Sequence, residues 1–307
     1  MGESVEKMSD DSWKESLISQ MIIAMAESRD NQEEVCSEIG QCYFTQAPAR
    51  LFKYYRGTAQ NIQNIESGKM WFSAPCNFND VFDCRIAVDR QAVFDAAINA
   101  APVPIKKGSR AWLDIQTGTR KETKKLEKRF DDLRRSIGVA CFSETYDSVL
   151  MWSHYGDRHH GFCAEYGLLD INKQLNYTPA PVVYSTDSVV LSNFSETEIN
   201  AVAASVFVRS LFTKAKEWNY EREWRIIQDQ SACGSRWNDE SKGALLDMIT
   251  PTSLILGCEA EPWLAERIKR YCENNKVNLY KMEKDPVRFS LVLTSLLNFD
   301  GSTLSQY

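Results

Sequence analysis

The chain has 307 residues, of which 43% are hydrophobic and 25% charged, and its net charge is −6. This length can bury a large core, and this composition excludes a disordered chain. The acidic balance argues against a surface that coats nucleic acid or acidic lipid over its whole extent, but it allows a local basic patch.

The cysteines and the hydropathy pattern indicate a protein that stays in the cytoplasm. Nine cysteines is an odd number, and none forms a C-x-x-C pair, so we interpret them as reduced thiols that serve as small hydrophobic side chains. No apolar stretch reaches the roughly 18 to 20 residues of a membrane span. The closest, residues 17–26, lacks a basic leader and a small-residue cleavage site. We therefore expect neither a signal peptide nor contact with a membrane.

Residues 1–48 are expected to form a helical N-terminal extension. Possible capping oxygens precede apolar residues at helical spacing, namely Asp10, Asp11 and Ser12 before Trp13, Leu17, Ile18, Met21, Ile22 and Met25. A second short helix is expected over residues 31–42. A helix this apolar must bury its stripe, either on the main domain, which is the simpler interpretation, or through self-association of residues 12–27.

Residues 49–307 are expected to form a single α+β domain with mixed, largely antiparallel sheets and peripheral helices. Strand patterns occur at residues 51–57, 69–75, 138–144, 161–167, 182–185, 253–257, 278–282 and 289–293. Helical patterns occur at residues 61–67, 90–100, 120–136, 196–212 and 262–274. The glycine fingerprints of nucleotide-binding loops and the common serine-hydrolase and zinc-protease motifs are absent.

The segment 220–227 carries the densest set of charged residues within an apolar pattern. In a strand, alternate side chains share a face, which places Glu221, Glu223 and Arg225 opposite Trp224 and Ile226. The two carboxylates would then point away from the core, toward solvent or a cleft. Crowded acids of this kind often have perturbed pKa values at a working site. The alternative is a solvated strand face with a structural ion pair.

Arg56 follows the first expected strand, on the same face as Tyr54 and just before Gly57. The planar guanidinium suits bidentate recognition of phosphate, and a glycine lets a ligand come close. Alternatively, the arginine pairs with a nearby acid and the glycine only forms a turn.

Two further segments supply candidate ligand contacts. Trp71 and Ser73 would face away from the core side of the second strand, and Asn79 lies in the turn-rich loop that follows. Residues 151–160 hold every histidine of the chain. A group containing His154 and Tyr155 that lines a polar cleft is favoured there over a metal site, because no cysteine or acid lies at a convincing ligand spacing.

The expected helix at 120–136 has eight lysines and arginines and four acids. Its acids alternate with its bases along the sequence, as on an ordinary solvated helix. We therefore favour a solvated helix over a nucleic-acid contact at this position.

Several uncommon short motifs follow one another in a fixed order from about Leu51 to past Leu256. They are K-Y-Y-R-G, F-N-D-V-F-D, M-W-S-H-Y and E-R-E-W-R. In this respect the chain resembles a widespread bacterial family catalogued only as a domain of unknown function. It departs from that family at Val81, where the family usually has proline.

A weaker resemblance implies an activity. Y-R-G on a first strand, F-S on a second and E-x-E on a late strand are similar to the arginine–serine–glutamate pattern of ADP-ribosyltransferases. The resemblance implies that Arg56 contacts NAD, that Ser73 supports the nicotinamide pocket and that Glu223 is catalytic while Glu221 positions the nucleophile. A carboxylate at the ribose would stabilise the cation that forms when nicotinamide leaves. Tyr54, Trp71 or Tyr155 would stack on a ring of the substrate.

Three functions are therefore open at this point. The first is an NAD-dependent ADP-ribosyltransferase or NAD glycohydrolase, by analogy a bacterial toxin or phage-defence effector, whose acceptor is a protein or a nucleic acid. The second is a non-catalytic module that senses a nucleotide or nucleic acid and associates through its N-terminal helices. The third is a hydrolase that uses Asp80, Asp83, Glu221 and Glu223 with a divalent ion.

Overall fold

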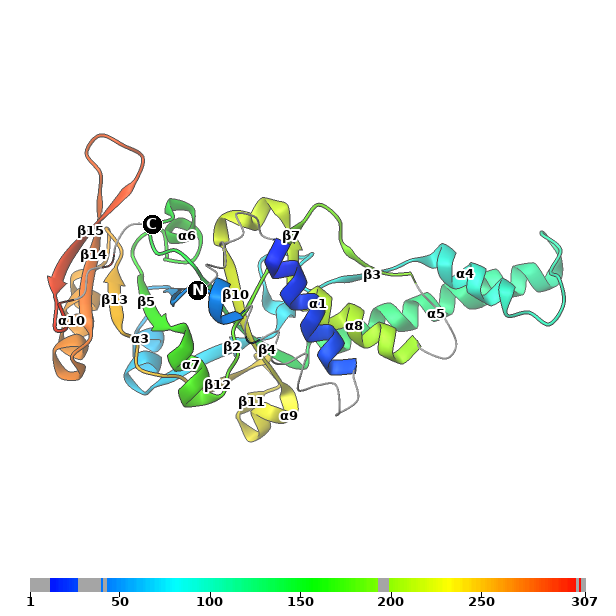
Figure 1. Cartoon of the computed structure of the whole chain (residues 1–307), viewed down its shortest axis with the longest axis horizontal. Helices are drawn as coiled ribbons and strands as arrows, with labels where there is room; N and C mark the ends of the chain where they lie inside the picture. The colour runs from blue at the N-terminus through cyan, green and yellow to red at the C-terminus, as the bar shows by residue number, and fades with distance from the viewer. Residues whose placement is uncertain (1–11, 27–39, 41–42, 193–198, 302–303, 305–307) are drawn as a thin grey trace, which may run out of the picture. The chain divides into compact units, whose positions relative to one another are not determined.

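The computed structural model describes residues 12–26, 40, 43–192, 199–301 and 304 (Figure 1). Two compact units emerge, each assembled from separate stretches of chain. The first unit consists of Met1–Ala47, Ala74–Ile137 and Val182–Lys216, and the second consists of Pro48–Ser73, Gly138–Pro181 and Glu217–Tyr307. Residues 1–47 of the expected N-terminal extension thus belong to the first unit, while the single domain expected over 49–307 stays a prediction.

The first unit is mainly helical. Its elements are α1 (Ser12–Ala26), the 3-10 helix η1 (Pro75–Asn77), β3 (Ile86–Val88), α4 (Arg90–Asn99), α5 (Arg110–Arg134), β7 (Val183–Ser185), β8 (Val189–Leu191), α8 (Ile199–Leu211) and β9 (Thr213–Ala215). Two short parallel pairs, β3 with β8 and β7 with β9, join stretches that lie far apart in the sequence. The expected second N-terminal helix lies outside the described residues, apart from Gly40.

Helix α1 buries its apolar stripe within its own unit. Leu17 is fully buried and Ile18 nearly so, and the helix packs against α8, where Arg209 donates a hydrogen bond to Ser19 at 3.0 Å. This confirms the simpler interpretation of that stripe. Ile23, near the end of the helix, is 49% exposed.

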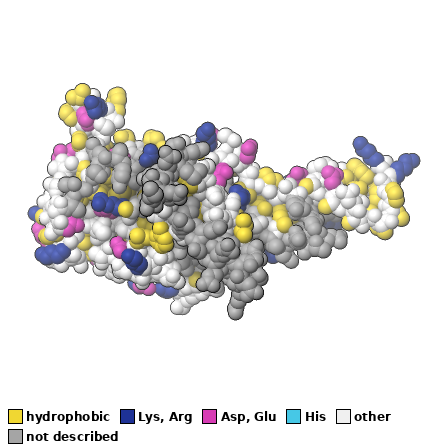
Figure 2. Space-filling model, viewed as in Figure 1, with side chains coloured by type: hydrophobic (Ala, Val, Ile, Leu, Met, Phe, Trp, Pro, Cys, Tyr) yellow, Lys and Arg dark blue, Asp and Glu magenta, His cyan; other side chains and the backbone are white. Residues whose placement is uncertain are grey.

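Helices α4 and α5 form an antiparallel hairpin. Asp89 caps α4 and Ser109 caps α5, so α5 begins ten residues before the helix expected from the charge pattern. Phe94 and Trp112 meet edge to face between the two helices, with ring centroids 5.4 Å apart. Figure 2 shows Lys and Arg side chains gathered at the end of this hairpin, at the right of the view.

The second unit is built on a sheet that, within the described residues, has eleven strands. The strands of its main path, in spatial order, are β11 (Trp237–Asn238), β12 (Gly243–Asp247), β2 (Lys69–Ser73), β4 (Ile137–Ser143), β1 (Arg50–Tyr55), β5 (Phe162–Gly167), β13 (Ser253–Leu256), β14 (Asn278–Lys284) and β15 (Leu291–Leu297). Strand β10 (Glu223–Asp229) pairs with β4 and with β6 (Ala180–Pro181). Among the described residues of this sheet, the strand pairs with a defined register are antiparallel except β13 with β14, which confirms an α+β fold.

Helices surround this sheet and its core. They are α3 (Ala59–Glu66), α6 (Val149–His154), α7 (Leu168–Leu175), α9 (Gln230–Cys233) and α10 (Pro262–Asn275), with the 3-10 helices η2 (Lys216–Glu221) and η3 (Gly234–Arg236). Thr58 caps α3 and Ser148 caps α6 through their side-chain oxygens. On the side of α6, Phe52, Tyr54, Tyr146 and Trp152 form an aromatic core cluster.

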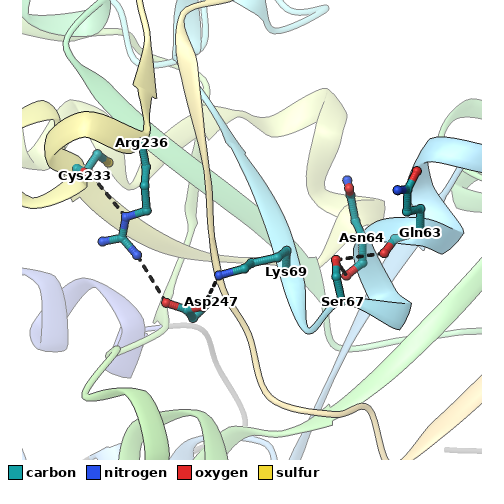
Figure 3. A network of polar contacts seen from close by, with 7 residues as sticks. All are labelled: Gln63, Asn64, Ser67, Lys69, Cys233, Arg236 and Asp247. Atoms are coloured by element: carbon teal, nitrogen blue, oxygen red, sulfur yellow. Dashed lines mark hydrogen bonds and ion pairs between the residues drawn. The ribbon is translucent and has the colours of Figure 1, made fainter.

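A polar network holds β2 beside β12 (Figure 3). The Asp247 carboxylate lies between two cations: Lys69 Nζ on β2, with which it forms an ion pair, and Arg236 Nη1, which is 3.2 Å from Oδ2. Both cations lower the pKa of Asp247, with the hydrogen bond from Lys69 as the largest cause. The pairing of β2 and β12 is therefore reinforced by charge at one end.

Two findings bear on the environment of the whole chain. Within the described residues, no helix is both long and apolar enough to cross a membrane. The described cysteines are free thiols, of which Cys84, Cys163, Cys233 and Cys272 are buried and Cys76, Cys141 and Cys258 are partly buried.

Candidate carboxylate and aromatic site

The segment expected to be one strand from 220 to 227 divides at Arg222. Glu221 ends η2, Glu223 begins β10, and Arg222 between them has a φ of 44°. A positive φ is costly for a side chain of this size and breaks the regular alternation of a strand. Of the two surroundings expected for Glu221 and Glu223, solvent or a cleft, open solvent is wrong, because each side chain is only 3% exposed.

Glu223 and Arg225 form a buried ion pair on one face of β10. Arg225 Nε lies 2.8 Å from Glu223 Oε1, and Nη2 lies 3.0 Å from Oε2. Arg225 is fully buried, so this bidentate geometry compensates the removal of both charges from water. The pattern correctly placed the two side chains on one face. It did not predict that both faces of β10 are covered, since Trp224 and Ile226 are buried too.

Lys53 lies close to this pair and was not among the expected site residues. Its Nζ donates a hydrogen bond to the carbonyl of Cys141 at 2.9 Å. Burial lowers the pKa of Lys53, and the nearby Glu223 carboxylate opposes this shift. Burial also raises the pKa of the Cys141 thiol well above its ordinary value. A lysine within an apolar strand was the signal that could have identified Lys53.

Glu221 lies at the edge of a group of aromatic side chains. Tyr155 donates its hydroxyl proton to Glu221 Oε1 at 2.6 Å, and His154 Nδ1 is 3.0 Å from the hydroxyl of Tyr220. The His154 ring lies 6.5 Å from that of Trp218, and Trp218 lies 6.1 Å from Tyr220. We call these five residues the aromatic–carboxylate cluster. His154 is exposed and the other rings are partly exposed, so the cluster reaches the surface of the unit.

The loop after α6 connects this cluster to the end of β1. Its residues Asp157, Arg158 and His159 all have positive φ, which turns the chain tightly toward Gly161. A Cβ atom on Gly57 would lie 2.9 Å from the carbonyl oxygen of His160. The absence of a side chain at Gly57 therefore lets the backbone of His160 come close. The expected approach of a ligand at this glycine stays a prediction.

Arg56 itself is exposed at the end of β1. Within the described part of the chain, its guanidinium has no hydrogen bond or ion pair, so the expected structural alternative of a pairing acid is not seen there. One segment, 154–160, thus contacts Glu221 at its start and Gly57 at its end. This segment therefore links Glu221 to the end of β1, where Arg56 lies next to Gly57.

The strands of Arg56, Ser73 and Glu223 are all neighbours of β4. Ser73 lies opposite Val139, whereas β1 pairs with β4 at Ser143. Four residues of β4 separate these two positions, which is roughly 13 Å along an extended strand. Ser143 donates a hydrogen bond to the carbonyl of Glu221 at 2.6 Å, so Ser73 lies toward the other end of β4 from Glu221.

The remaining expected contacts have local roles. Tyr54 packs edge to face on Trp152 and donates a hydrogen bond to the carbonyl of Thr145 at 3.0 Å, so it is a core residue. Trp71 covers Gly243 on the neighbouring strand, where a Cβ atom would collide with its ring. Asn79 is exposed and belongs to the first unit.

The two acids in the loop around Asn79, Asp80 and Asp83, make contacts within the protein. Asp80 accepts a hydrogen bond from the amide of Phe82 at 2.9 Å, as a turn-forming residue does, and Asp83 forms a buried ion pair with Lys214 at 3.5 Å. Among the described residues, no three His, Cys, Asp or Glu side chains are arranged to hold a metal ion.

The second unit is thus an α+β fold that carries two buried carboxylates beside partly exposed aromatic rings. A family described as "Protein of unknown function (DUF2971)" matches residues 151–226, which include His154, Tyr155 and both acids. This match is shorter than the stretch over which the short motifs occur. No curated protein and no solved structure matches the chain.

Proposed function

We propose that the chain is an ADP-ribosyltransferase-like enzyme that uses NAD as a substrate and breaks the bond between nicotinamide and ribose. The observation that supports this most is the aromatic–carboxylate cluster, in which Tyr155 holds Glu221 at 2.6 Å beside partly exposed rings. A ring of NAD stacked on these side chains would come close to Glu221, since Tyr155 contacts both His154 and the acid.

The chemistry needs a negative charge where the ribose becomes positive. As the glycosidic bond breaks, its electron pair leaves with neutral nicotinamide, and the sugar carbon is attacked by water or by an acceptor that loses a proton. A fixed carboxylate lowers the energy of the cationic transition state. Arg56, exposed near the other end of the segment 154–160, supplies a guanidinium for the pyrophosphate.

The two acids are proposed to have different tasks. The resemblance assigns the ribose contact to Glu223, but both oxygens of that side chain are engaged by Arg225. The surroundings of Glu221 favour it for the ribose contact, because its partner Tyr155 belongs to the cluster that reaches the surface. Glu223 with Arg225 then stabilises the start of β10, directly after Glu221.

The test is release of nicotinamide from NAD by the purified full chain, measured by chromatography. We expect Glu221→Gln to lower the rate by about 100-fold or more, the usual scale for a group that stabilises charge in a transition state. Tyr155→Phe should lower it by about tenfold through loss of the hydrogen bond. Glu217→Gln, on the exposed side of the same 3-10 helix, is the matched control and should leave the rate unchanged. Full activity of Glu221→Gln would remove this mechanism.

The second candidate is a non-catalytic nucleotide-binding module. It is favoured by the combination of exposed rings with the exposed guanidinium of Arg56, which suits binding without any reaction. NAD or another nucleotide would then raise the melting temperature without releasing nicotinamide, and Arg56→Ala would abolish the shift. Self-association through residues 12–27 belongs to this candidate. It would have to use the part of α1 around Ile23, because Leu17 and Ile18 are buried.

A further inference from the structure

A basic surface on α5 is the feature of the first unit that the proposed function leaves unexplained. Between Lys106 and Arg135 the sequence has eleven lysines and arginines and five acids, a net charge of +6 in a chain of net charge −6. Helix α5 itself, Arg110–Arg134, has eight lysines and arginines and five acids, a net charge of +3. The rest of the excess comes from the residues directly before and after the helix, and a basic stretch of this kind favours an anionic partner.

The helix separates charges that alternate in the sequence. Six cations form two adjacent rows at i, i+4 spacing, Arg120–Lys124–Lys128 and Lys121–Lys125–Arg129, and all six are exposed. At 100° per residue, these rows cover the side of α5 opposite the buried Thr119, Thr123 and Phe130. The helix is exposed to solvent over these three turns, as expected, but its cations gather on one side of it.

The acids of α5 lie beside the rows or beyond them, and they neutralise few of these cations. Glu122 pairs with Lys125 at 3.0 Å and Asp132 with Lys128 at 2.8 Å. Within the described residues, no ion pair involves Arg120, Lys121, Lys124 or Arg129. Four cations thus remain available over about 14 Å of helix, with about 6 Å between successive members of a row.

A groove between α4 and α5 meets these rows at one residue, Arg120, since Thr119 and Trp112 in its lining lie on the other side of the helix from the rows. An extended ligand would therefore have to pass from the groove around the helix at Arg120 to reach the rest of the rows. The groove has a volume of about 810 Å³, and its lining includes Arg90, Lys107 and Arg120 but no carboxylate among the described residues. Phe94 and Trp112 also line it, both partly exposed. This combination of cations with aromatic rings is the arrangement that binds backbone phosphates and stacks bases.

Thr119 is a polar residue of the groove lining whose hydroxyl is buried. The residue is 8% exposed, and its hydroxyl has no hydrogen-bond partner in the described structure. A buried hydroxyl without a partner is costly, and a ligand that supplies a donor or acceptor would remove that cost.

We infer that the α4–α5 hairpin binds single-stranded nucleic acid, with phosphates along the cation rows and bases at Trp112 and Phe94. The rows alone would suit any polyanion. The aromatic rings inside a cationic groove favour a strand whose bases are unpaired over a duplex or an acidic membrane. This inference does not depend on the proposed enzymatic activity, because every residue in it lies in the first unit.

The test is fluorescence anisotropy of a labelled 20-nucleotide strand, DNA or RNA, with the purified full chain at several salt concentrations. Contact with about five phosphates predicts a loss of affinity of roughly 100-fold between about 50 and 200 mM salt. The double variant Arg120→Glu, Lys124→Glu should weaken binding by about 10- to 100-fold. The matched control Lys269→Glu, Arg288→Glu changes the net charge equally on exposed sites of the second unit and should have little effect.

A second pair of variants tests the bases. Trp112→Ala should weaken binding by about tenfold, while Trp263→Ala, which removes an exposed tryptophan elsewhere, should not. No binding at about 50 mM salt, or equal loss in both charge variants, would overturn the inference. Equal affinity for duplex DNA or for phosphatidylserine vesicles, with Trp112→Ala neutral, would also contradict it. Because Arg120 and Lys124 are exposed, their double variant remains informative even if Trp112→Ala fails to fold.

Discussion

Among single residues, Arg225 is the one whose removal should most destabilise the second unit. Its guanidinium is fully buried and holds both oxygens of Glu223. Removing one partner of such a pair leaves a buried charge without compensation, which typically costs 3–5 kcal/mol. We therefore expect Arg225→Met to lower the free energy of unfolding by about 3–5 kcal/mol, as measured by urea denaturation at pH 7.

The paired substitution separates charge from packing. Replacing both residues with apolar side chains of similar size, Glu223→Leu with Arg225→Met, removes the uncompensated charge, so this double variant should be more stable than Arg225→Met alone. If Arg225→Met costs less than about 1 kcal/mol, the pair is accessible to solvent and the buried network is not what holds β10.

The same residues show what a strand pattern can predict. Alternation correctly placed Glu223 and Arg225 on one face, because a period of two is local geometry. Burial of both faces of β10 depends on which strands pair with it, and that long-range pairing leaves no periodic signal in the segment itself. The left-handed backbone at Arg222 had no sequence signal either, since arginine is not a residue that favours positive φ.

At the level of elements, Asp247 should make the pairing of β2 with β12 sensitive to pH. Hydrogen bonding to Lys69 and the charge of Arg236 lower the pKa of this carboxyl below its ordinary value. The folded state therefore gains stability from Asp247 above the ordinary pKa, and it loses this gain as the pH falls through the lowered pKa. We expect Asp247→Asn to cost about 0.5–1 kcal/mol at pH 7, because the group is half exposed.

The pH dependence of the stability lost in Asp247→Asn tests the sign of this contribution. The difference between Asp247→Asn and the unchanged chain should shrink as the pH falls from about 5 to about 2, because the native carboxyl is then protonated as well. Denaturant unfolding at each pH measures it. Glu273→Gln, an exposed site on α10, should show no such trend. A difference that stays constant down to pH 2 would mean that the ion pairs with Lys69 and Arg236 do not stabilise the fold.

For helix α5, the sequence showed the composition of the element but not how its charged side chains are arranged around the helix. The cap at Ser109 is an ordinary start signal. The alternation of acids and bases along the sequence did not show the basic surface. In a helix, residues four positions apart lie side by side, whereas neighbours in the sequence point in different directions. Counting charges along helical rows would have revealed the basic surface in advance.

For the whole molecule, the order of segments along the chain conceals how they group. The chain passes between the two units five times, at residues 47/48, 73/74, 137/138, 181/182 and 216/217. Local patterns predicted the described α-helices of the first unit and most described strands of the second. They missed β3, β8 and β9 of the first unit and the short helices α6, α7 and α9 of the second. They could not predict the parallel pairs of β3 with β8 and β7 with β9, which join residues some 30 to 100 positions apart.

Because α1 is part of the first unit, a cavity beneath it should loosen that unit selectively. Leu17 is fully buried where α1 packs on α8, and truncation of such a leucine typically costs 2–5 kcal/mol. In hydrogen exchange, Leu17→Ala should therefore speed exchange in α8 while the amides of β5 and β13 keep their protection, if the units open separately. Ile23→Ala, at an exposed site on the same helix, should change neither. Equal acceleration in β5 and β13 would instead mean that both units open in one cooperative step.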